Sequence, residues 1–219
     1  MDWNSARILY QLMRFWQATF TYSVGILLKL LLLSNFVGRT AVSLEKISQQ
    51  LEENSDKKLP PVELWDPPYC GEIDLQIKGD GSWYYNGTVF KRLSLVKLFA
   101  SVLKKEDEDY YLVTPVEKVK IQVDDVPFVL TQWDWQDEDK AEMRVSTNLD
   151  DKFMLNAEHP VTLGDDGSLY VIVRRNLLAK VHRNVYYQWI DIAKEEKTEH
   201  GTEMVFYSAG QRICLGLID

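Results

Sequence analysis

Residues 77–92 read I-K-G-D-G-S-W-Y-Y-N-G-T-V-F-K-R, and we expect the fold to be organised around this stretch. A related stretch, L-G-D-D-G-S-L-Y-V-I-V-R-R, occupies residues 163–175. The Asp-Gly-Ser triplet and the tyrosine that follows recur at one offset, since 167 minus 81 is 86. Asp-Gly supplies residues that tolerate positive φ, so each stretch predicts a β-hairpin turn.

Each copy continues with an extended run, a basic pair and an amphipathic helix. In the first copy the pair is Lys91-Arg92, and apolar residues at helical spacing predict a helix over residues 95–103. In the second copy the pair is Arg174-Arg175, and we expect the helix to begin near Asn176. Our interpretation is a duplicated hairpin-helix unit. The alternative is that two ordinary Asp-Gly hairpins match by chance.

Composition indicates a globular protein of two modest domains. The residue patterns favour a binding module rather than a catalyst. The chain has 219 residues, of which 46% are hydrophobic and 12% aromatic. The formal net charge of -8 would repel a long polyanion, so the composition disfavours a nucleic acid polymer as partner. The pattern of strands and helices predicts an α+β fold.

No residue pattern indicates a catalyst, a cofactor or a metal. Cys70 and Cys214 are the only cysteines, far apart and outside any Cys/His cluster, which argues against a disulfide scaffold or a zinc site and favours a reducing, cytoplasmic compartment. The three histidines are isolated from one another. The chain has no P-loop, no dinucleotide-binding glycine pattern and no G-x-S-x-G elbow, so we do not expect an enzyme.

The amino-terminal residues 1–42 form an apolar extension with three competing interpretations. Residues 15–37 are long enough to span a bilayer, which takes about 20 residues, although Lys29 near the middle is costly there. In the first interpretation the stretch is a membrane anchor. Only in this case is a membrane a partner, and the protein would then be located at the inner membrane. The others are a surface amphipathic helix and residues translated from upstream of the true start, because the globular pattern begins at Ser43.

Two globular domains are expected after this extension, over residues 43–109 and 110–219. Helical spacing predicts a short helix at residues 43–51, and residues 104–109, K-K-E-D-E-D, read as a solvated exit from the first domain. Strands are expected at residues 71–77, 110–113, 119–123, 127–135, 143–147, 152–155, 160–163, 169–173, 203–207 and 212–217. Trp133 and Trp135 lie on one face of their strand, either as core packing or as a surface that stacks on a ligand.

Three stretches together resemble a known bacterial family. They are W-D-P-P-Y-C-G-E-I-D-L-Q-I-K-G-D-G-S-W-Y-Y-N-G at residues 65–87, Y-L-V-T-P-V-E-K-V-K-I-Q-V-D-D-V-P-F at residues 111–128, and V-R-R-N-L-L-A-K-V-H-R-N-V-Y-Y at residues 173–187. The chain from about residue 59 is similar to the family catalogued as domain of unknown function 1285. The resemblance implies an α+β fold with a duplicated motif and a carboxy-terminal domain superficially like pleckstrin-homology domains. It also implies a site for a nucleotide-like molecule at the domain interface, with a role in signalling.

The residues themselves point to a small anion near the second basic pair. Arginine presents a planar fork that matches phosphate or carboxylate, and a helix amino terminus near Asn176 would add backbone donors. The candidate ligand-binding residues are Trp83, Arg92, Arg174, Arg175, Arg183 and Tyr186. One alternative is that the arginines pair with acidic side chains on neighbouring loops. Another is a protein-interaction module that uses sheet edges and the two tryptophans, and that is tethered to a membrane if residues 15–37 are an anchor.

Overall fold

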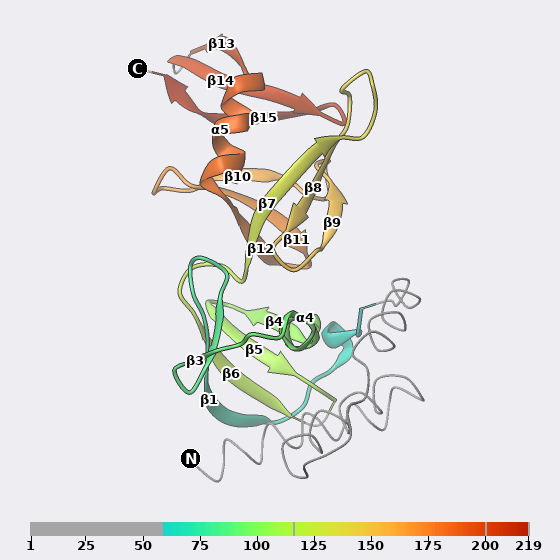
Figure 1. Cartoon of the computed structure of the whole chain (residues 1–219), viewed down its shortest axis with the longest axis vertical. Coiled ribbons are helices and arrows are strands. Elements are labelled where there is room, and N and C mark those ends of the chain that lie inside the picture. The colour runs from blue at the N-terminus through green and yellow to red at the C-terminus, as the bar shows by residue number, and fades with distance from the viewer. Residues whose placement is uncertain (1–58, 116, 200, 219) are drawn as a thin grey trace. The chain divides into compact units, whose positions relative to one another are not determined.

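The computed structural model describes residues 59–115, 117–199 and 201–218 (Figure 1). These residues form two compact units that do not follow the chain in order. Of the described residues, the first unit contains 59–73, 98–106 and 110–121, and the second contains 74–97, 107–109 and 122–218. The predicted helix at residues 43–51 and the apolar extension of residues 1–42 lie outside the described residues. Among the described residues, no helix is both long and apolar enough to cross a membrane.

The first sheet has six strands in the order β3-β2-β1-β6-β5-β4. They are β1 (Tyr69–Ile77), β2 (Trp83–Tyr85), β3 (Thr88–Val89), β4 (Leu103–Glu106), β5 (Asp109–Val113) and β6 (Lys118–Val123). A short 3-10 helix, η1 (Val62–Leu64), precedes β1, and helix α4 (Leu93–Ser101) follows β3. The alternation that predicted β1 is confirmed, because Ile73, Leu75 and Ile77 are all buried.

Strand β4 corrects the prediction of a solvated exit at residues 104–109. Most of this charged run is strand, and Asp107, with φ 52, turns the chain into β5. Glu106 lies 3.1 Å from the Lys104 ammonium and 2.7 Å from that of Lys118. The run can therefore pair within a sheet, since its charges are balanced by neighbouring side chains.

The same strands correct the predicted boundary between residues 109 and 110. Strands β5 and β6 pair with each other and belong to the sheet that contains β1 to β3. A boundary at residue 109 would separate β4 from its neighbour β5. The charge run that suggested a linker is a hairpin, so the first sheet continues to Val123.

The second sheet also has six strands, in the order β10-β11-β12-β7-β8-β9. They are β7 (Phe128–Trp135), β8 (Met143–Thr147), β9 (Lys152–Met154), β10 (Val161–Leu163), β11 (Leu169–Arg174) and β12 (Leu177–Val181). Strands β12 and β7 are parallel, with Ala179 beside Phe128, while the other neighbours pair antiparallel. Buried residues from β7, β8, β11 and β12 form its core.

Residues 177–181 form strand β12, so the helix predicted to begin near Asn176 begins later. L-L-A-K-V alternates in burial, with Leu177, Ala179 and Val181 buried, as a strand requires. Arg175, with φ 55, opens the turn between β11 and β12. Helix α5 (Arg183–Ile192) starts after His182, whose ring nitrogen accepts a hydrogen bond from the Asn184 amide at 3.2 Å.

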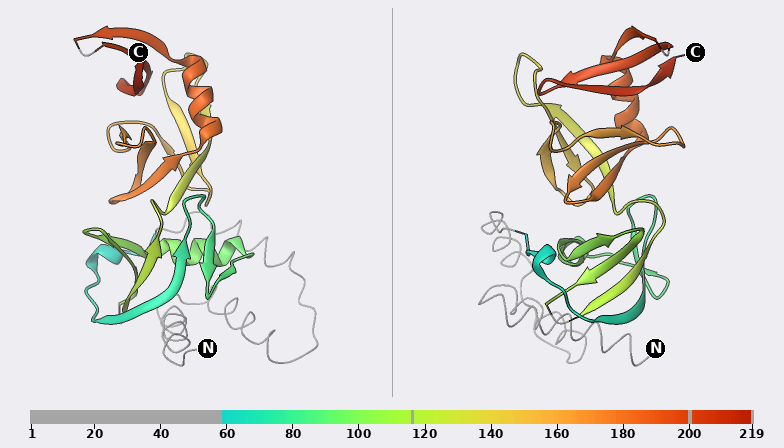
Figure 2. Two further views of the ribbon diagram at one scale, coloured as in Figure 1. Left: turned by 90° about the vertical axis from the view of Figure 1, so that its left-hand side faces the viewer. Right: turned by 180° about the vertical axis from the view of Figure 1, so that it is seen from behind.

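Helix α5 leads into a third sheet of strands β13 (Lys194–Thr198), β14 (Gly201–Ser208) and β15 (Gln211–Ile218), all antiparallel. The left view of Figure 2 shows α5 running from the second sheet toward the third. Trp189 on α5 is fully buried, and its ring lies 5.2 Å from that of Phe206 on β14. The predicted strands at residues 203–207 and 212–217 are confirmed, whereas the highly charged β13 has no apolar alternation to reveal it.

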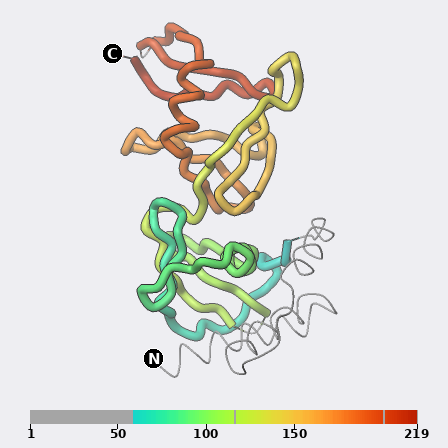
Figure 3. Tube along the Cα trace, in the orientation of Figure 1, coloured from blue at the N-terminus to red at the C-terminus, as the bar shows by residue number. Residues whose placement is uncertain are grey.

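The two Asp-Gly turns have the same internal structure. In the first, Lys78 N donates to Ser82 O at 2.9 Å and Gly81 N to Lys78 O at 2.8 Å. In the second, Gly164 N donates to Ser168 O at 2.8 Å and Gly167 N to Gly164 O at 3.0 Å. The second turn joins β10 to β11 and projects from its sheet (Figure 3). The turn repeat is confirmed, although the helix comes later after the second turn than after the first.

Candidate functional site

A cleft of about 330 Å³ lies beside the first Asp-Gly turn, wholly within the second compact unit. The turn, strands β2 and β3, the start of α4 and one residue after β8 contribute to its walls. The lining residues are Asp80, Gly81, Ser82, Trp83, Val89, Phe90, Lys91, Leu93, Val96 and Asn148. The lining therefore combines an apolar wall with one carboxylate, one ammonium and one amide.

The Asp80-Gly81-Ser82 turn positions the carboxylate of the cleft. Gly81 has φ +80, the left-handed conformation that this type of hairpin turn requires and that glycine adopts without strain. Asp80 Oδ1 accepts a hydrogen bond from the Ser82 amide at 2.9 Å and another from the Ser82 hydroxyl. These bonds, the hydroxyl one foremost, lower the pKa of Asp80, which is therefore ionised at neutral pH.

Asn148 holds this turn against strand β7. Its Nδ2 donates to Gly81 O at 3.2 Å, and its Oδ1 accepts from the Val129 amide at 3.0 Å. The backbone of Asn148 completes the arrangement by donating to Val129 O at 2.8 Å. A Cβ on Gly81 would lie 2.5 Å from Asn148 Nδ2, so the close approach requires glycine as well as the positive φ.

Trp83 forms part of the floor of the cleft and carries an unused donor. It pairs with Ile77 across the hairpin, and only 2% of its surface is exposed. Its indole Nε1 is buried and has no hydrogen-bond partner among the described residues. A buried donor without a partner is costly, and native proteins rarely leave one. Among the described residues, the fold supplies no acceptor for this atom.

Helix α4 begins at the mouth of the cleft. In its first turn the amides of Leu95 and Val96 donate to Arg92 O at 3.1 and 3.3 Å. The amides of Leu93 and Ser94 donate to no atom in the described part of the chain. No acidic residue occupies this first turn. Within the described residues, the helix therefore presents unpaired backbone donors and the positive end of its dipole next to Lys91.

Comparison with known proteins adds the family. Residues 60–126 match the model described as "Domain of unknown function (DUF1285), N-terminal domain", and residues 127–215 match "Protein of unknown function (DUF1285), C-terminal domain". The chain belongs to the DUF1285 family. The family expected from the sequence motifs is thereby confirmed, and so is a two-domain architecture, which is mostly β-sheet with few helices.

Two solved structures of DUF1285 proteins resemble this chain. A DUF1285 family protein from Silicibacter pomeroyi DSS-3 is 33% identical, covers 82% of this chain and 97% of its own, and superposes with a TM-score of 0.67. A DUF1285 family protein from Shewanella baltica OS155 is 32% identical, covers 53% of this chain and 90% of its own, and has a TM-score of 0.45. A search of curated proteins found no match.

The arginines predicted as anion ligands in this DUF1285 chain do not line the cleft. Arg174 lies on β11, pairs with Asp151, and places its guanidinium 4.6 Å from the centre of the Phe128 ring. Burial lowers the pKa of Arg174, and the adjacent Asp151 opposes that shift. The alternative of pairing with an acidic side chain on a neighbouring loop therefore applies to this residue.

The other predicted residues are spread over separate elements. Arg175 lies in the turn after β11, and Arg183 is the exposed first residue of α5. Tyr186, also on α5, contacts Tyr187 at a ring separation of 6.0 Å. Arg92 lies immediately before α4, where its carbonyl accepts the first helical hydrogen bonds. Of the six predicted residues, Trp83 alone is among those that line the cleft.

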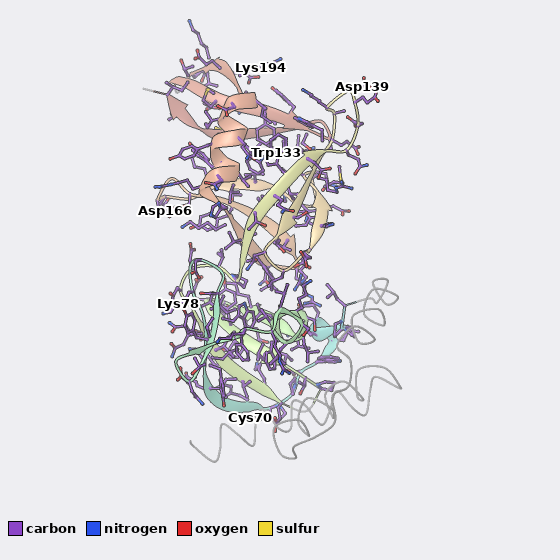
Figure 4. The ribbon with its side chains drawn as sticks, in the orientation of Figure 1. Cys70, Lys78, Trp133, Asp139, Asp166 and Lys194 are labelled. Carbon is purple, nitrogen blue, oxygen red and sulfur yellow. The ribbon has the colours of Figure 1, made fainter. Side chains whose placement is uncertain are left out.

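The two tryptophans on β7 contact each other in this DUF1285 fold. Trp133 and Trp135 lie on one face, as predicted, with ring centres 5.9 Å apart at an interplanar angle of 89°. Trp133, labelled on β7 in Figure 4, donates from Nε1 to Gln188 Oε1 on α5 at 2.7 Å. This hydrogen bond links Trp133 to α5.

Sequence reasoning missed Asn148, Leu93 and Val89. Leu93 and Val89 are 47% and 39% exposed, and both line the cleft. Asn148 sits in the sequence S-T-N-L-D-D, which indicates a turn but not which segment the amide will meet. Within residues 59–115, 117–199 and 201–218, no group of three or more His, Cys, Asp or Glu side chains is arranged to hold a metal.

Proposed function

We propose that this protein is a non-catalytic binding module whose cleft takes one small ligand with an anionic group and an apolar or planar body. Binding would serve a sensing role, such as signal transduction. Trp83 carries the proposal, because it combines an aromatic surface with a buried indole donor that has no partner among the described residues. A ligand acceptor at this position would satisfy that donor.

The size of the cleft supports a small ligand. Ligand sites usually measure about 300–1,000 Å³, so a cleft of about 330 Å³ is at the lower end of that range. A nucleobase or an amino acid has a suitable size, whereas a dinucleotide would leave most of its atoms in solvent. A nucleotide-like ligand remains within this proposal if its base enters the cleft and its phosphate stays at the rim.

Lys91 is the positive charge that supports an anionic ligand. It lines the cleft, is exposed, and forms no ion pair with the described residues. Arg174, by contrast, is already paired with Asp151, so a ligand would have to displace that carboxylate. We therefore assign the anionic group to the Lys91 side of the cleft.

The chemistry of the lining supports binding rather than catalysis. A general base works best when its pKa is near the operating pH. The pKa of Asp80 is instead lowered by its hydrogen bonds to Ser82, so this carboxylate stays charged and is a weak base. Asp80 is better suited to pairing with a positive group than to moving a proton.

We also propose that the fold of the carboxy-terminal domain is superficially similar to that of pleckstrin-homology domains. Antiparallel strands accompanied by the single helix α5 support it. Superposition of this domain on pleckstrin-homology domains is the test, and a TM-score below about 0.5 would argue against the likeness.

Isothermal titration calorimetry with a blocked cleft tests the binding proposal. We expect at least one of adenosine monophosphate, phenylpropanoate and free phenylalanine to bind, and Leu93→Trp to abolish the binding by filling the cleft. Leu163→Trp is the matched control, because Leu163 is 49% exposed, close to the 47% of Leu93, and lies on β10 outside the cleft. Absence of binding by all three compounds, or equal loss in both variants, would contradict the proposal.

A further inference from the structure

We propose that the ligand of this cleft is a small zwitterion with an apolar side chain, of the α-amino acid class. This inference rests on the proposed function and specifies its ligand. Both charges of such a ligand have a counterpart in the lining, since Lys91, the start of α4 and Asp80 all line the cleft. The apolar side chain would then cover Val89 and Leu93.

Two independent observations assign the carboxylate of the ligand. The first is the amino terminus of α4, a helix of nine residues with no acidic residue in its first turn and with the amides of Leu93 and Ser94 free in the described structure. The second is Lys91, which lines the cleft, adds a full positive charge and forms no ion pair with the described residues. Trp83, also in the lining, carries a buried indole N–H without a partner among the described residues, which a ligand acceptor that reaches it would satisfy.

Asp80 assigns the ammonium group and argues against a purely anionic ligand. Its Oδ1 accepts both hydrogen bonds from Ser82, while Oδ2 accepts none from the described residues. A ligand that carries only negative charge would be repelled by this carboxylate, and a phosphate dianion more than a carboxylate. A ligand ammonium instead gains a partner, so the single negative charge in the lining selects a zwitterion.

The remaining wall fits an apolar side chain. Val89, Leu93 and Val96 lie near the start of α4, and the ring of Trp83 completes the surface. Val89 and Leu93 are 39% and 47% exposed, so a bound side chain would remove apolar area from water. Asp80 and Lys91 are the charged residues that line the cleft within the described part of the chain.

Matched ligands test the inference by calorimetry. Phenylalanine is compared with phenylpropanoate, which lacks the ammonium, with phenylethylamine, which lacks the carboxylate, and with adenosine monophosphate. We expect phenylalanine to bind tightest, and each analogue that lacks one charge to bind at least about tenfold more weakly, because each loses a charged hydrogen bond.

Two substitutions separate the two charges. Asp80→Asn should remove the preference for phenylalanine over phenylpropanoate, and Lys91→Met should remove the preference over phenylethylamine. Asp166→Asn is the matched control, because Asp166 also accepts hydrogen bonds from the amide and the hydroxyl of the serine two residues later, and it lines no part of the cleft. The control should retain the wild-type order of affinities.

The outcomes separate this inference from the proposed function. If phenylpropanoate or adenosine monophosphate binds as tightly as phenylalanine, and Leu93→Trp blocks it, the zwitterion inference is wrong while the binding function stands. If phenylalanine binds but Asp80→Asn and Lys91→Met leave its preferences unchanged, the assignment of the charges is wrong. If none of the four compounds binds, both proposals fail.

Discussion

The two Asp-Gly-Ser turns share their internal hydrogen bonds and differ in their surroundings. Gly81 and Gly167 have φ values of +80° and +76°, and the serine in each turn donates to the aspartate two residues earlier. An added Cβ on Gly81 would meet Asn148 and Val129, whereas one on Gly167 would meet nothing within 4 Å. Local sequence therefore determines the shape of a turn, and the packing around the turn determines whether it can contribute to a site.

The largest expected effect comes from replacing the two glycines. Gly81→Ala combines left-handed strain with a contact of 2.5 Å to Asn148 Nδ2, and we expect it to lower the free energy of unfolding by about 2–5 kcal/mol. Gly167→Ala carries the strain alone and should cost about 1–2 kcal/mol. Asn148 cannot relieve the clash without breaking its bonds to Gly81 and Val129.

Urea denaturation of both variants measures this difference. Equal losses of stability would show that the turn at Gly81 is not held against Asn148 in solution. The cleft would then have a different shape in solution, since Gly81 and Asn148 both line it, and the ligand titrations would have to be interpreted with that shape.

A smaller effect is expected from Asn148→Ala. The substitution leaves the amide of Val129 without its side-chain acceptor and Gly81 O without its donor, and we expect a loss of about 1–3 kcal/mol in the free energy of unfolding. Asn148→Asp separates the two bonds, because the carboxylate can still accept from Val129 but cannot donate to Gly81. Stability of Asn148→Asp equal to that of the wild type would mean that the bond to Gly81 contributes nothing.

This comparison also shows what the sequence could predict. The Asp-Gly turns and the alternation of Ile73, Leu75 and Ile77 depend on neighbours in the chain, and the structure confirms them. The bond between Asn148 and Gly81 joins residues 67 positions apart, and no local pattern specifies it. The cleft was missed for that reason, although Trp83 was among the expected residues.

The predicted arginines lie outside the cleft for a related physical reason. A basic pair such as Arg174-Arg175 matches any anion, and the sequence does not say whether a ligand or an acidic side chain of the protein will provide it. In the structure Asp151 meets Arg174. The helix expected near Asn176 was wrong because the apolar residues at 177, 179 and 181 fit a strand, and a stripe that includes Val181 and Val185 also fits a helix.

The smallest expected effect concerns the acid titration of the two turns. Hydrogen bonds from Ser82 and Ser168 are the main cause that lowers the pKa of Asp80 and of Asp166 below the ordinary value of 3.8. A carboxyl group with a lowered pKa in the folded state stabilises the fold above pH 3.8, and this contribution is lost as the pH falls through the folded pKa. We expect Ser82→Ala to raise the pKa of Asp80 and Ser168→Ala to raise that of Asp166. Neither variant should change the pKa of the aspartate in the other turn, as measured by the carboxyl carbon shifts in an NMR titration.

The two variants should differ in size, because Lys180 also bonds Asp166, at 3.4 Å. Ser168→Ala should therefore leave the pKa of Asp166 partly lowered, whereas Asp80 in Ser82→Ala keeps only its interaction with Lys78 and backbone bonds. Equal increases in pKa in the two variants would show that Lys180 does not affect the pKa of Asp166.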